Sequence, residues 1–145
     1  MICYLDTSGL VKLYVREKGS DLVREIVRQC SAAATSKVAY AEARAAFARA
    51  MRQGVMEDKD YREIVAALQN DWPTYLAMEV SDAVILLAGD LCEKHGLRGF
   101  DSIHLASAVT LKTQVSEEMV AACFDARLWE AFRVCLPVIP QTQPV

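Results

Sequence analysis

The stretch Met1-Ile2-Cys3-Tyr4-Leu5-Asp6-Thr7-Ser8 opens the sequence. A short apolar run that favours β-structure leads to a single carboxylate and two hydroxyls, and the pattern then becomes helical. A buried strand with an acid at its carboxyl end is a common way for an open α/β sheet to position a catalytic group. Asp6 can also be no more than the N-cap of the following helix. On this stretch alone the two interpretations stay open.

Strand-like and helical patterns alternate along the rest of the chain. Further strands are predicted at residues 32–36, 119–124 and 134–138, and residues 75–80 are predicted to be extended or irregular. Helices are predicted at residues 9–15, 20–29, 38–52, 57–70, 81–95, 101–112 and 126–132. Pro137 and Pro140 confine the last strand to an edge of the sheet. In the alanine-rich helix 38–52 we expect Val38, Ala41, Ala45 and Phe47 to face the core.

This alternation predicts a three-layer α/β/α domain with a central parallel sheet of four to five strands. A chain of 145 residues is long enough to bury one core, so a single domain is expected at residues 1–140, followed by a tail at 141–145.

The composition excludes several classes of protein. The net charge of −3 carries no overall signature of nucleic-acid binding, so such a role needs a local patch of Lys and Arg. Five widely spaced cysteines indicate neither a disulfide framework nor a zinc site, which favours a reducing cytoplasm. Asp6 interrupts the first apolar run, so no signal peptide is expected, and no stretch is long enough to span a membrane.

Four acids are distinguished by their positions in the predicted fold. Asp6 and Asp125 follow strands, Asp101 opens a helix after a glycine-containing turn, and Glu42 lies in the first turns of a helix that follows a strand. In a parallel sheet these positions meet at one edge. Each acid alone is as well explained as a cap or a surface residue, but clustered carboxylates repel one another and raise each other's pKa. A hard divalent cation such as Mg²⁺ or Mn²⁺ would stabilise the cluster and could activate water against a phosphodiester.

The motifs around these acids resemble those of PIN domains, and most closely those of VapC-type toxin ribonucleases of bacterial toxin–antitoxin pairs. The resemblance spans nearly the whole chain and rests on four segments: Leu5-Asp6-Thr7-Ser8 with Leu10-Val11-Lys12, Ala41-Glu42, the characteristic Leu97-Arg98-Gly99-Phe100-Asp101-Ser102-Ile103-His104-Leu105-Ala106-Ser107-Ala108, and Phe124-Asp125-Ala126-Arg127-Leu128.

The resemblance implies a Mg²⁺- or Mn²⁺-dependent endoribonuclease that forms a homodimer and binds a cognate antitoxin. It implies that Asp6, Glu42 and Asp101 are core metal ligands and catalytic residues, with Asp125 as a fourth acid acting through water. Ser8 would support the metal or its water, and Thr7 occupies a similar supporting position. One departure is Cys123, which stands where relatives often carry Thr or Ser, so the placement of Asp125 is an open question.

Several other polar residues have competing interpretations. His104 could be a general base or a ligand, but a structural histidine of its helix is the simpler interpretation. Lys12 and Arg16 lie near the acid-bearing strand and are the better candidates for binding RNA phosphate. Arg44, Arg49 and Arg52 could form a local phosphate-binding patch or a solvated helical face. Trp72 and Tyr75 are expected to be core or interface aromatics.

Two rival functions remain. A phosphatase or phosphoacceptor domain could use Asp6 as a nucleophile, but a haloacid-dehalogenase-like site needs a second Asp two residues later, where this chain has Ser8, and receiver domains need an adjacent acidic pair. A non-catalytic module could keep the fold and bind RNA or protein, and Cys123 is the residue that favours it.

Overall fold

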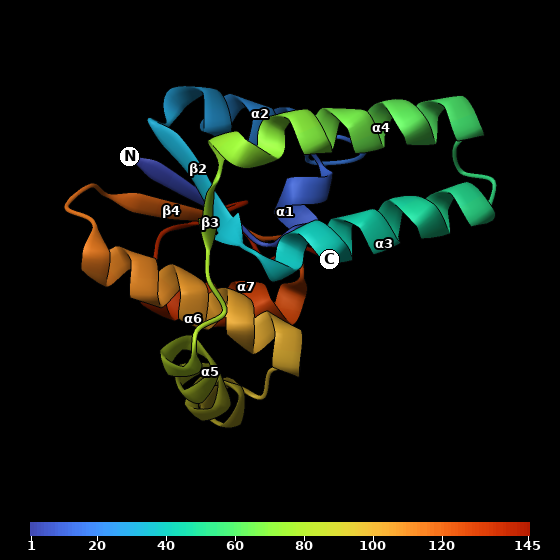
Figure 1. The fold of residues 1–145 in the computed structure, drawn as a ribbon. Helices are drawn as coiled ribbons and strands as arrows, with labels where there is room; N and C mark the ends of the chain where they lie inside the picture. The colour runs from blue at the N-terminus through green and yellow to red at the C-terminus, as the bar shows by residue number, and fades with distance from the viewer.

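The computed structural model describes residues 1–145 and has a five-stranded parallel sheet in the order β3-β2-β1-β4-β5 (Figure 1). The strands are β1 (Ile2–Leu5), β2 (Ala32–Ser36), β3 (Leu76–Met78), β4 (Met119–Ala122) and β5 (Val138–Ile139). The helices are α1 (Thr7–Val11), α2 (Ser20–Gln29), α3 (Val38–Arg52), α4 (Asp58–Asp71), α5 (Asp82–His95), α6 (Gly99–Gln114) and α7 (Ala126–Cys135), with a short 3₁₀ turn η1 (Trp72–Thr74). The predicted three-layer α/β/α architecture is confirmed.

Strand β1 lies at the centre of the sheet, and its side chains alternate between two cores. Ile2 and Tyr4 point to the core that α6 and α7 cover, whereas Cys3 and Leu5 point to the core beneath α1 to α4. All four residues of β1 are at most 2% exposed. Because both faces of the strand are covered, the sequence of β1 is apolar throughout rather than alternating.

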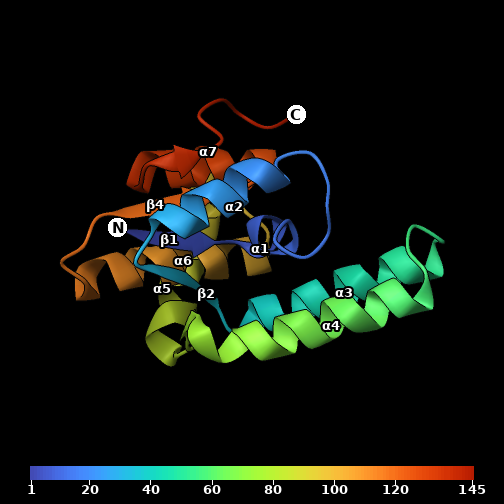
Figure 2. The ribbon, with the colours of Figure 1, turned by 90° about the horizontal axis from the view of Figure 1, so that it is seen from above.

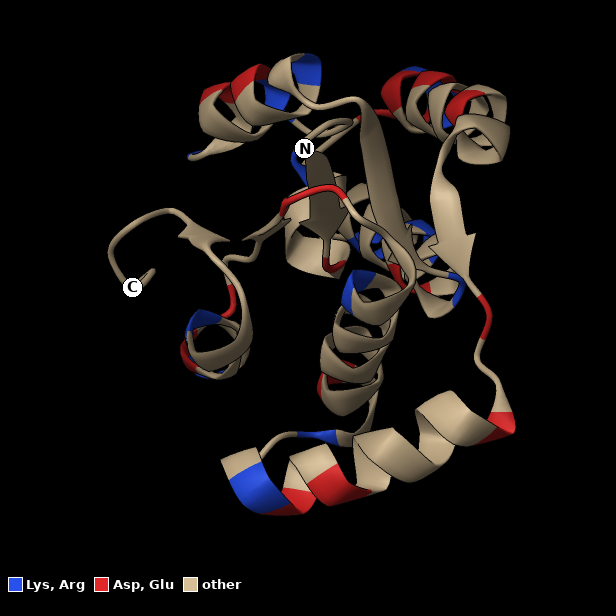
Figure 3. Ribbon diagram, turned by 90° about the vertical axis from the view of Figure 1, so that its left-hand side faces the viewer, with Lys and Arg blue, Asp and Glu red and all other residues tan.

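Two parts of the chain extend beyond the layers that cover the sheet. Helices α3 and α4 form an antiparallel pair whose far end projects away from the sheet in both ribbon views (Figures 1 and 2). Helix α5 packs against α6 through a small cluster that contains Val84, Ala88 and Ala106. Acidic and basic segments interleave on the helices seen in Figure 3, so the charge is mixed rather than gathered on one face.

The structure corrects several predicted boundaries. Residues 76–78 form a true strand, helix α6 begins at Gly99 instead of Asp101, and α7 continues to Cys135, so that the last strand covers only Val138–Ile139 at the sheet edge. A three-residue strand is too short to show a period, and the edge strand has only two residues to signal it.

The predicted inward face of α3 is also partly wrong. The buried residues are Ala39, Ala43 and Phe47, whereas Ala41 and Ala45 are exposed. Alanine is compatible with either side of a helix, so an alanine-rich helix gives little amphipathic signal.

No helix is both long and apolar enough to cross a membrane.

Gly9 lies where α1 passes closest to β4. A Cβ atom added at Gly9 would stand 2.5 Å from the carbonyl oxygen of Ala122, which belongs to the backbone and cannot rotate away. The close approach of α1 to the sheet therefore requires a glycine here.

We predict that Gly9→Ala lowers the free energy of unfolding by on the order of 2 kcal/mol, because the new methyl group overpacks a rigid contact. Urea denaturation of the metal-free protein measures the effect. Gly89→Ala on α5 is the matched control, since nothing lies within 4 Å of the added Cβ. It should stabilise the helix by about 0.5–1 kcal/mol. Equal stability of Gly9→Ala and wild type would contradict the packing argument.

Candidate active site

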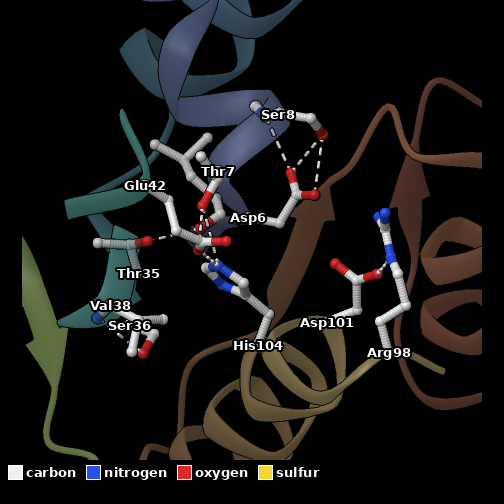
Figure 4. Close-up of polar contacts among 12 residues, drawn as sticks. Asp6, Thr7, Ser8, Thr35, Ser36, Val38, Glu42, Arg98, Asp101 and His104 are labelled. Atoms are coloured by element: carbon white, nitrogen blue, oxygen red, sulfur yellow. Dashed lines mark hydrogen bonds and ion pairs between the residues drawn. The ribbon is translucent and has the colours of Figure 1, made fainter. Parts of the chain in front are cut away.

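The four acids singled out in the sequence line one pocket at the carboxyl edge of the sheet. Figure 4 shows three of them, Asp6, Glu42 and Asp101. The pocket has a volume of about 330 Å³. Its lining includes Asp6, Thr7, Ser8, Glu42, Asp101 and Asp125, together with Val11, Glu17, Ala46, Arg49, Arg98 and His104. Four separate elements supply the acids: the end of β1, helix α3, helix α6 and the start of α7.

Asp6 is both a helix cap and a pocket residue, so the two interpretations of the opening stretch do not exclude each other. Its Oδ1 accepts a 2.8 Å hydrogen bond from the backbone N–H of Gly9 at the start of α1. The Ser8 hydroxyl lies 2.7 and 2.8 Å from the two carboxylate oxygens and itself accepts from the N–H of Phe124 at 2.8 Å. Asp6 is only 3% exposed. Burial raises the pKa of Asp6, and the nearby His104 and these hydrogen bonds only partly offset this effect.

Glu42 is held by a chain of hydrogen bonds that crosses from the buried Tyr4 of the sheet to the partly buried Glu42 on α3. The Thr7 hydroxyl donates to Glu42 Oε1 at 2.6 Å, and His104 Nε2 lies 2.9 Å from the same oxygen. On its other side His104 Nδ1 lies 3.0 Å from the hydroxyl of Tyr4. The chain is satisfied when Tyr4 donates to Nδ1 and Nε2–H donates to Glu42. Burial acts to raise the pKa of Glu42, but the hydrogen bonds from His104 and Thr7 outweigh it, so the pKa is lowered.

His104 thus lies in the core, only 1% exposed, with its ring bonded to a pocket carboxylate. His104 is thus a structural histidine, as the simpler interpretation expected, but its contact with Glu42 was not predicted. The spacing gave no signal, because Glu42 and His104 are 62 residues apart.

Arg98 joins the other two acids and is the main site residue that sequence reasoning missed. Its Nε donates to Asp101 Oδ2 at 3.0 Å, and its Nη2 donates to Asp125 Oδ2 at 3.2 Å. The Arg98 side chain is 72% exposed. Figure 4 shows Arg98 beside Asp101, apart from the group formed by Glu42, Thr7 and His104. The signal available in the sequence was an Arg three residues before Asp101, at the residue that precedes the helix.

Cys123 lies beneath Asp6 instead of supporting the Asp125 side chain. Its thiol is 3.4 Å from Asp6 Oδ2 and 3.6 Å from the backbone oxygen of Asp125. Burial and the neighbouring Asp6 raise the pKa of Cys123, so the sulfur is a neutral thiol that can donate weakly. The Asp125 carboxylate is held by the N–H of Leu128 at 2.9 Å and by Arg98, and these contacts do not need a hydroxyl at position 123.

The residues proposed for phosphate binding are placed differently from one another. Lys12 is 8% exposed, forms a 2.7 Å ion pair with Glu17 and lies over the Phe124 ring, and it does not line the pocket. Arg16 pairs with Asp21 and also lies outside the pocket lining. Arg49 lines the pocket.

Two further predictions about side chains concern helix α3 and the aromatics. Arg44 hydrogen-bonds to the hydroxyl of Tyr40 at 3.0 Å instead of facing the pocket. Trp72 and Tyr75 pack against the core beneath α1 to α4, Trp72 edge-to-face with Tyr40, and neither lines the pocket.

The donor set of the pocket fits a hard divalent cation, because it consists of carboxylate and hydroxyl oxygens. No three His, Cys, Asp or Glu side chains are arranged to hold a metal ion. The contacts above account for this arrangement: Arg98 holds Asp101 and Asp125 at one end, and His104 with Thr7 holds Glu42 at the other.

We predict that Asp6→Asn stabilises the metal-free protein at neutral pH. The pKa of Asp6 is raised in the folded state, so its contribution to the free energy of unfolding is lost as pH rises through the folded-state pKa. An Asn at this position stays neutral and can still accept from Gly9. Urea denaturation in EDTA from about pH 4 to pH 8 should show a smaller loss of stability in Asp6→Asn than in wild type.

Asp90→Asn is the control for this experiment, because Asp90 is exposed on α5 and forms no ion pair. It should keep the pH dependence of wild type. A lower stability of Asp6→Asn than of wild type at pH 8 would contradict the prediction that burial of this charge is costly.

Comparison with known proteins shows the family to which the chain belongs. The model of the PIN domain family matches residues 3–131, which includes all four acids. The chain is 35% identical over 127 residues to Ribonuclease VapC49 of Mycobacterium tuberculosis H37Rv, covering 88% of this chain and 86% of that protein. It is 36% identical over 128 residues to Ribonuclease VapC46 of the same strain, covering 88% of each chain.

Solved structures agree on the fold. The structure of FitAcB from Neisseria gonorrhoeae superposes with a TM-score of 0.70 at 16% identity, over 97% of this chain and 98% of that one. A toxin–antitoxin complex from Klebsiella pneumoniae superposes with a TM-score of 0.66 at 14% identity, over 97% and 98% of the two chains. With the family model covering most of the chain, and curated relatives above 30% identity over nearly their whole length, the chain belongs to the PIN domain family, in its VapC group.

Proposed function

We propose that this protein is a Mg²⁺- or Mn²⁺-dependent endoribonuclease of the VapC type. The observation that carries the proposal is the convergence of Asp6, Glu42, Asp101 and Asp125, from four elements, on one pocket in a member of this family. RNA as the substrate is supported by the relatives VapC49 and VapC46, both of which are named as ribonucleases.

The four carboxylates would hold the metal ion. When bound, such an ion supplies a water of lowered pKa and positive charge beside the phosphodiester. The residues of this chain orient the carboxylates for that task. Ser8 and the N–H of Gly9 fix Asp6, while Thr7 and His104 fix Glu42 and keep it ionised by lowering its pKa.

We further propose that a cognate antitoxin binds the protein and that two copies form a homodimer. The antitoxin is supported by the structural relatives, which include a toxin–antitoxin complex from Klebsiella pneumoniae and VapBC2 from Rickettsia felis bound to a DNA fragment from its promoter. The homodimer rests on the family resemblance, and light scattering of the purified protein tests it.

A non-catalytic binding module remains the second candidate. The specific observation in its favour is that no three ligating side chains are arranged for a metal ion. Thermal denaturation with increasing Mn²⁺ separates the two candidates, because a protein with a metal site is stabilised by a ligand that binds only the folded state. Absence of any Mn²⁺-linked stabilisation would favour the module.

We predict that Asp101→Asn keeps the fold and lowers RNA cleavage by at least about 100-fold, the size of effect seen when one group that stabilises transition-state charge is lost. The measurement is cleavage of total cellular RNA in Mg²⁺, in Mn²⁺ and in EDTA. Wild type should produce discrete metal-dependent fragments. Asp90→Asn serves as the control with an equal change in charge. Full activity of Asp101→Asn would refute the carboxylate mechanism.

A second prediction concerns Arg98, whose guanidinium occupies the same two carboxylates that a metal ion would use. Arg98→Gln should tighten Mn²⁺ binding by roughly two- to fivefold, as expected for removal of an exposed competing charge. Isothermal titration in the absence of RNA measures the affinity independently of catalysis. Arg98→Lys keeps the charge but lacks the forked geometry and should fall between the two. Unchanged or weaker Mn²⁺ binding by Arg98→Gln would exclude this competition.

A further inference from the structure

The two oxygens of the Glu42 carboxylate have unequal contacts. Oε1 accepts from the Thr7 hydroxyl at 2.6 Å and lies 2.9 Å from His104 Nε2, whereas Oε2 takes part in no hydrogen bond (Figure 4). The Glu42 side chain is 29% exposed and lines the pocket that the four acids share. Groups of the protein therefore occupy one oxygen, and the other is free to bind a cation in the pocket.

The hydrogen bonds behind Oε1 lead back to the central strand. His104 Nδ1 lies 3.0 Å from the Tyr4 hydroxyl, which is its only hydrogen-bond partner. An ionised carboxylate can only accept, so Nε2 carries the hydrogen beside Glu42, and Nδ1 of the neutral ring must accept. Tyr4 is then the donor to Nδ1. The bonds run in one order, in which Tyr4 donates to His104 and His104 donates to Glu42.

Tyr4 is a firmly fixed hydrogen-bond donor. It is 0% exposed, and strand pairing places it opposite Ala34 of β2 and Ala121 of β4. Its ring packs against Phe132 at a centroid distance of 5.9 Å and edge-on to His104 at 6.1 Å. A donor held by strand pairing on both sides and by ring packing has little freedom to lose, so its geometry is set before any ligand binds.

The same strand is thereby connected to two of the four acids. Asp6 follows the end of β1 directly, and Tyr4 stands two residues before it. Glu42 belongs to α3, and β1 is linked to it through Tyr4 and His104. The position of Glu42 relative to Asp6 therefore depends on a core residue that does not line the pocket.

We propose that Tyr4 is a positioning residue of the cation site: its hydroxyl, acting through His104, orients the Glu42 carboxylate so that Oε2 is presented to the cation. The inference rests on the proposed function, because it assigns a role at the same site. It adds a residue from the core of the sheet, and it predicts that loss of one buried hydroxyl weakens cation binding.

The first measurement needs no metal. ¹⁵N NMR of the metal-free, histidine-labelled protein at neutral pH should show His104 with a protonated Nε2 and a hydrogen-bonded, unprotonated Nδ1. Tyr4→Phe keeps the ring, and the Nδ1 signal should move to the position of an imidazole nitrogen that has no donor. His95 on α5, the other histidine, is the internal reference. A protonated Nδ1 in wild type, or an Nδ1 signal that Tyr4→Phe leaves unchanged, would overturn the proposal.

The second measurement is Mn²⁺ affinity by isothermal titration without RNA. Tyr4→Phe should weaken binding by about three- to tenfold, less than the 10–100-fold typical of a residue that bonds directly to a metal ligand. Tyr14→Phe is the matched control, because its hydroxyl bonds to Asp71 at 2.9 Å in the other core and lies outside the pocket lining. This control should leave the affinity and the His104 signals unchanged. Equal weakening by Tyr14→Phe would indicate a general loss of packing and contradict a specific role for Tyr4.

Two further variants test whether the effect passes through Glu42. In a Glu42→Gln background, Tyr4→Phe should cause little further loss of Mn²⁺ affinity, because the hydrogen bonds then end on a group of weakened cation binding. The same fold-change in both backgrounds would refute transmission through Glu42. His104→Asn interrupts the connection at its middle and should weaken Mn²⁺ binding at least as much as Tyr4→Phe. Wild-type affinity in His104→Asn overturns the proposal even if Tyr4→Phe does not fold.

Failure of this inference is distinguishable from failure of the proposed function. If wild type binds Mn²⁺ and cleaves RNA while Tyr4→Phe matches it in affinity and in the His104 signals, the role of Tyr4 is wrong and the nuclease stands. If wild type neither binds Mn²⁺ nor cleaves RNA, the proposed function is wrong, and the role of Tyr4 at a cation site is refuted with it.

Discussion

Burial of the Asp6 carboxylate at the end of the central strand is the constraint on which the rest of the site depends. Strand β1 is covered on both faces. Asp6 follows its carboxyl end and is itself only 3% exposed. A buried charge must be hydrogen-bonded, and Ser8 with the N–H of Gly9 meets that need. Gly9 also lies where α1 approaches β4 too closely for a Cβ atom. The same residue, Gly9, therefore allows α1 to pack closely against β4 and donates a hydrogen bond to Asp6.

The remaining carboxylates are held by two different means. Glu42 is positioned from inside the core by the His104 ring, which the Tyr4 hydroxyl orients in turn. Asp101 and Asp125 are held from the solvent side by Arg98. The buried chain fixes geometry with little freedom, whereas an exposed guanidinium exchanges partners readily. Glu42 is therefore held by partly buried hydrogen bonds, whereas Asp101 and Asp125 are held by an exposed ion-pair partner.

The sheet order also explains why acids from α3 and α7 reach the same pocket as Asp6. Strand β1 lies between β2, which leads into α3, and β4, which leads into α7. The starts of both helices therefore stand on opposite sides of Asp6, as expected at the carboxyl edge of a parallel sheet. Glu42 on α3 and Asp125 at the start of α7 therefore reach the pocket from these two sides.

The sequence by itself determined the α/β class, the first strand and the acids that follow strands or begin helices, because apolar runs and the starts of helices are local signals. That the first strand is the central one was decided only by the sheet order. It could not determine the inward face of the alanine-rich α3, since alanine has no strong preference for either side. Only the tertiary structure decided that His104 bonds to Glu42 across 62 residues, that Arg98 bridges Asp101 and Asp125, and that Lys12 pairs with Glu17. Those contacts depend on helix packing and side-chain direction, which no spacing along the chain encodes.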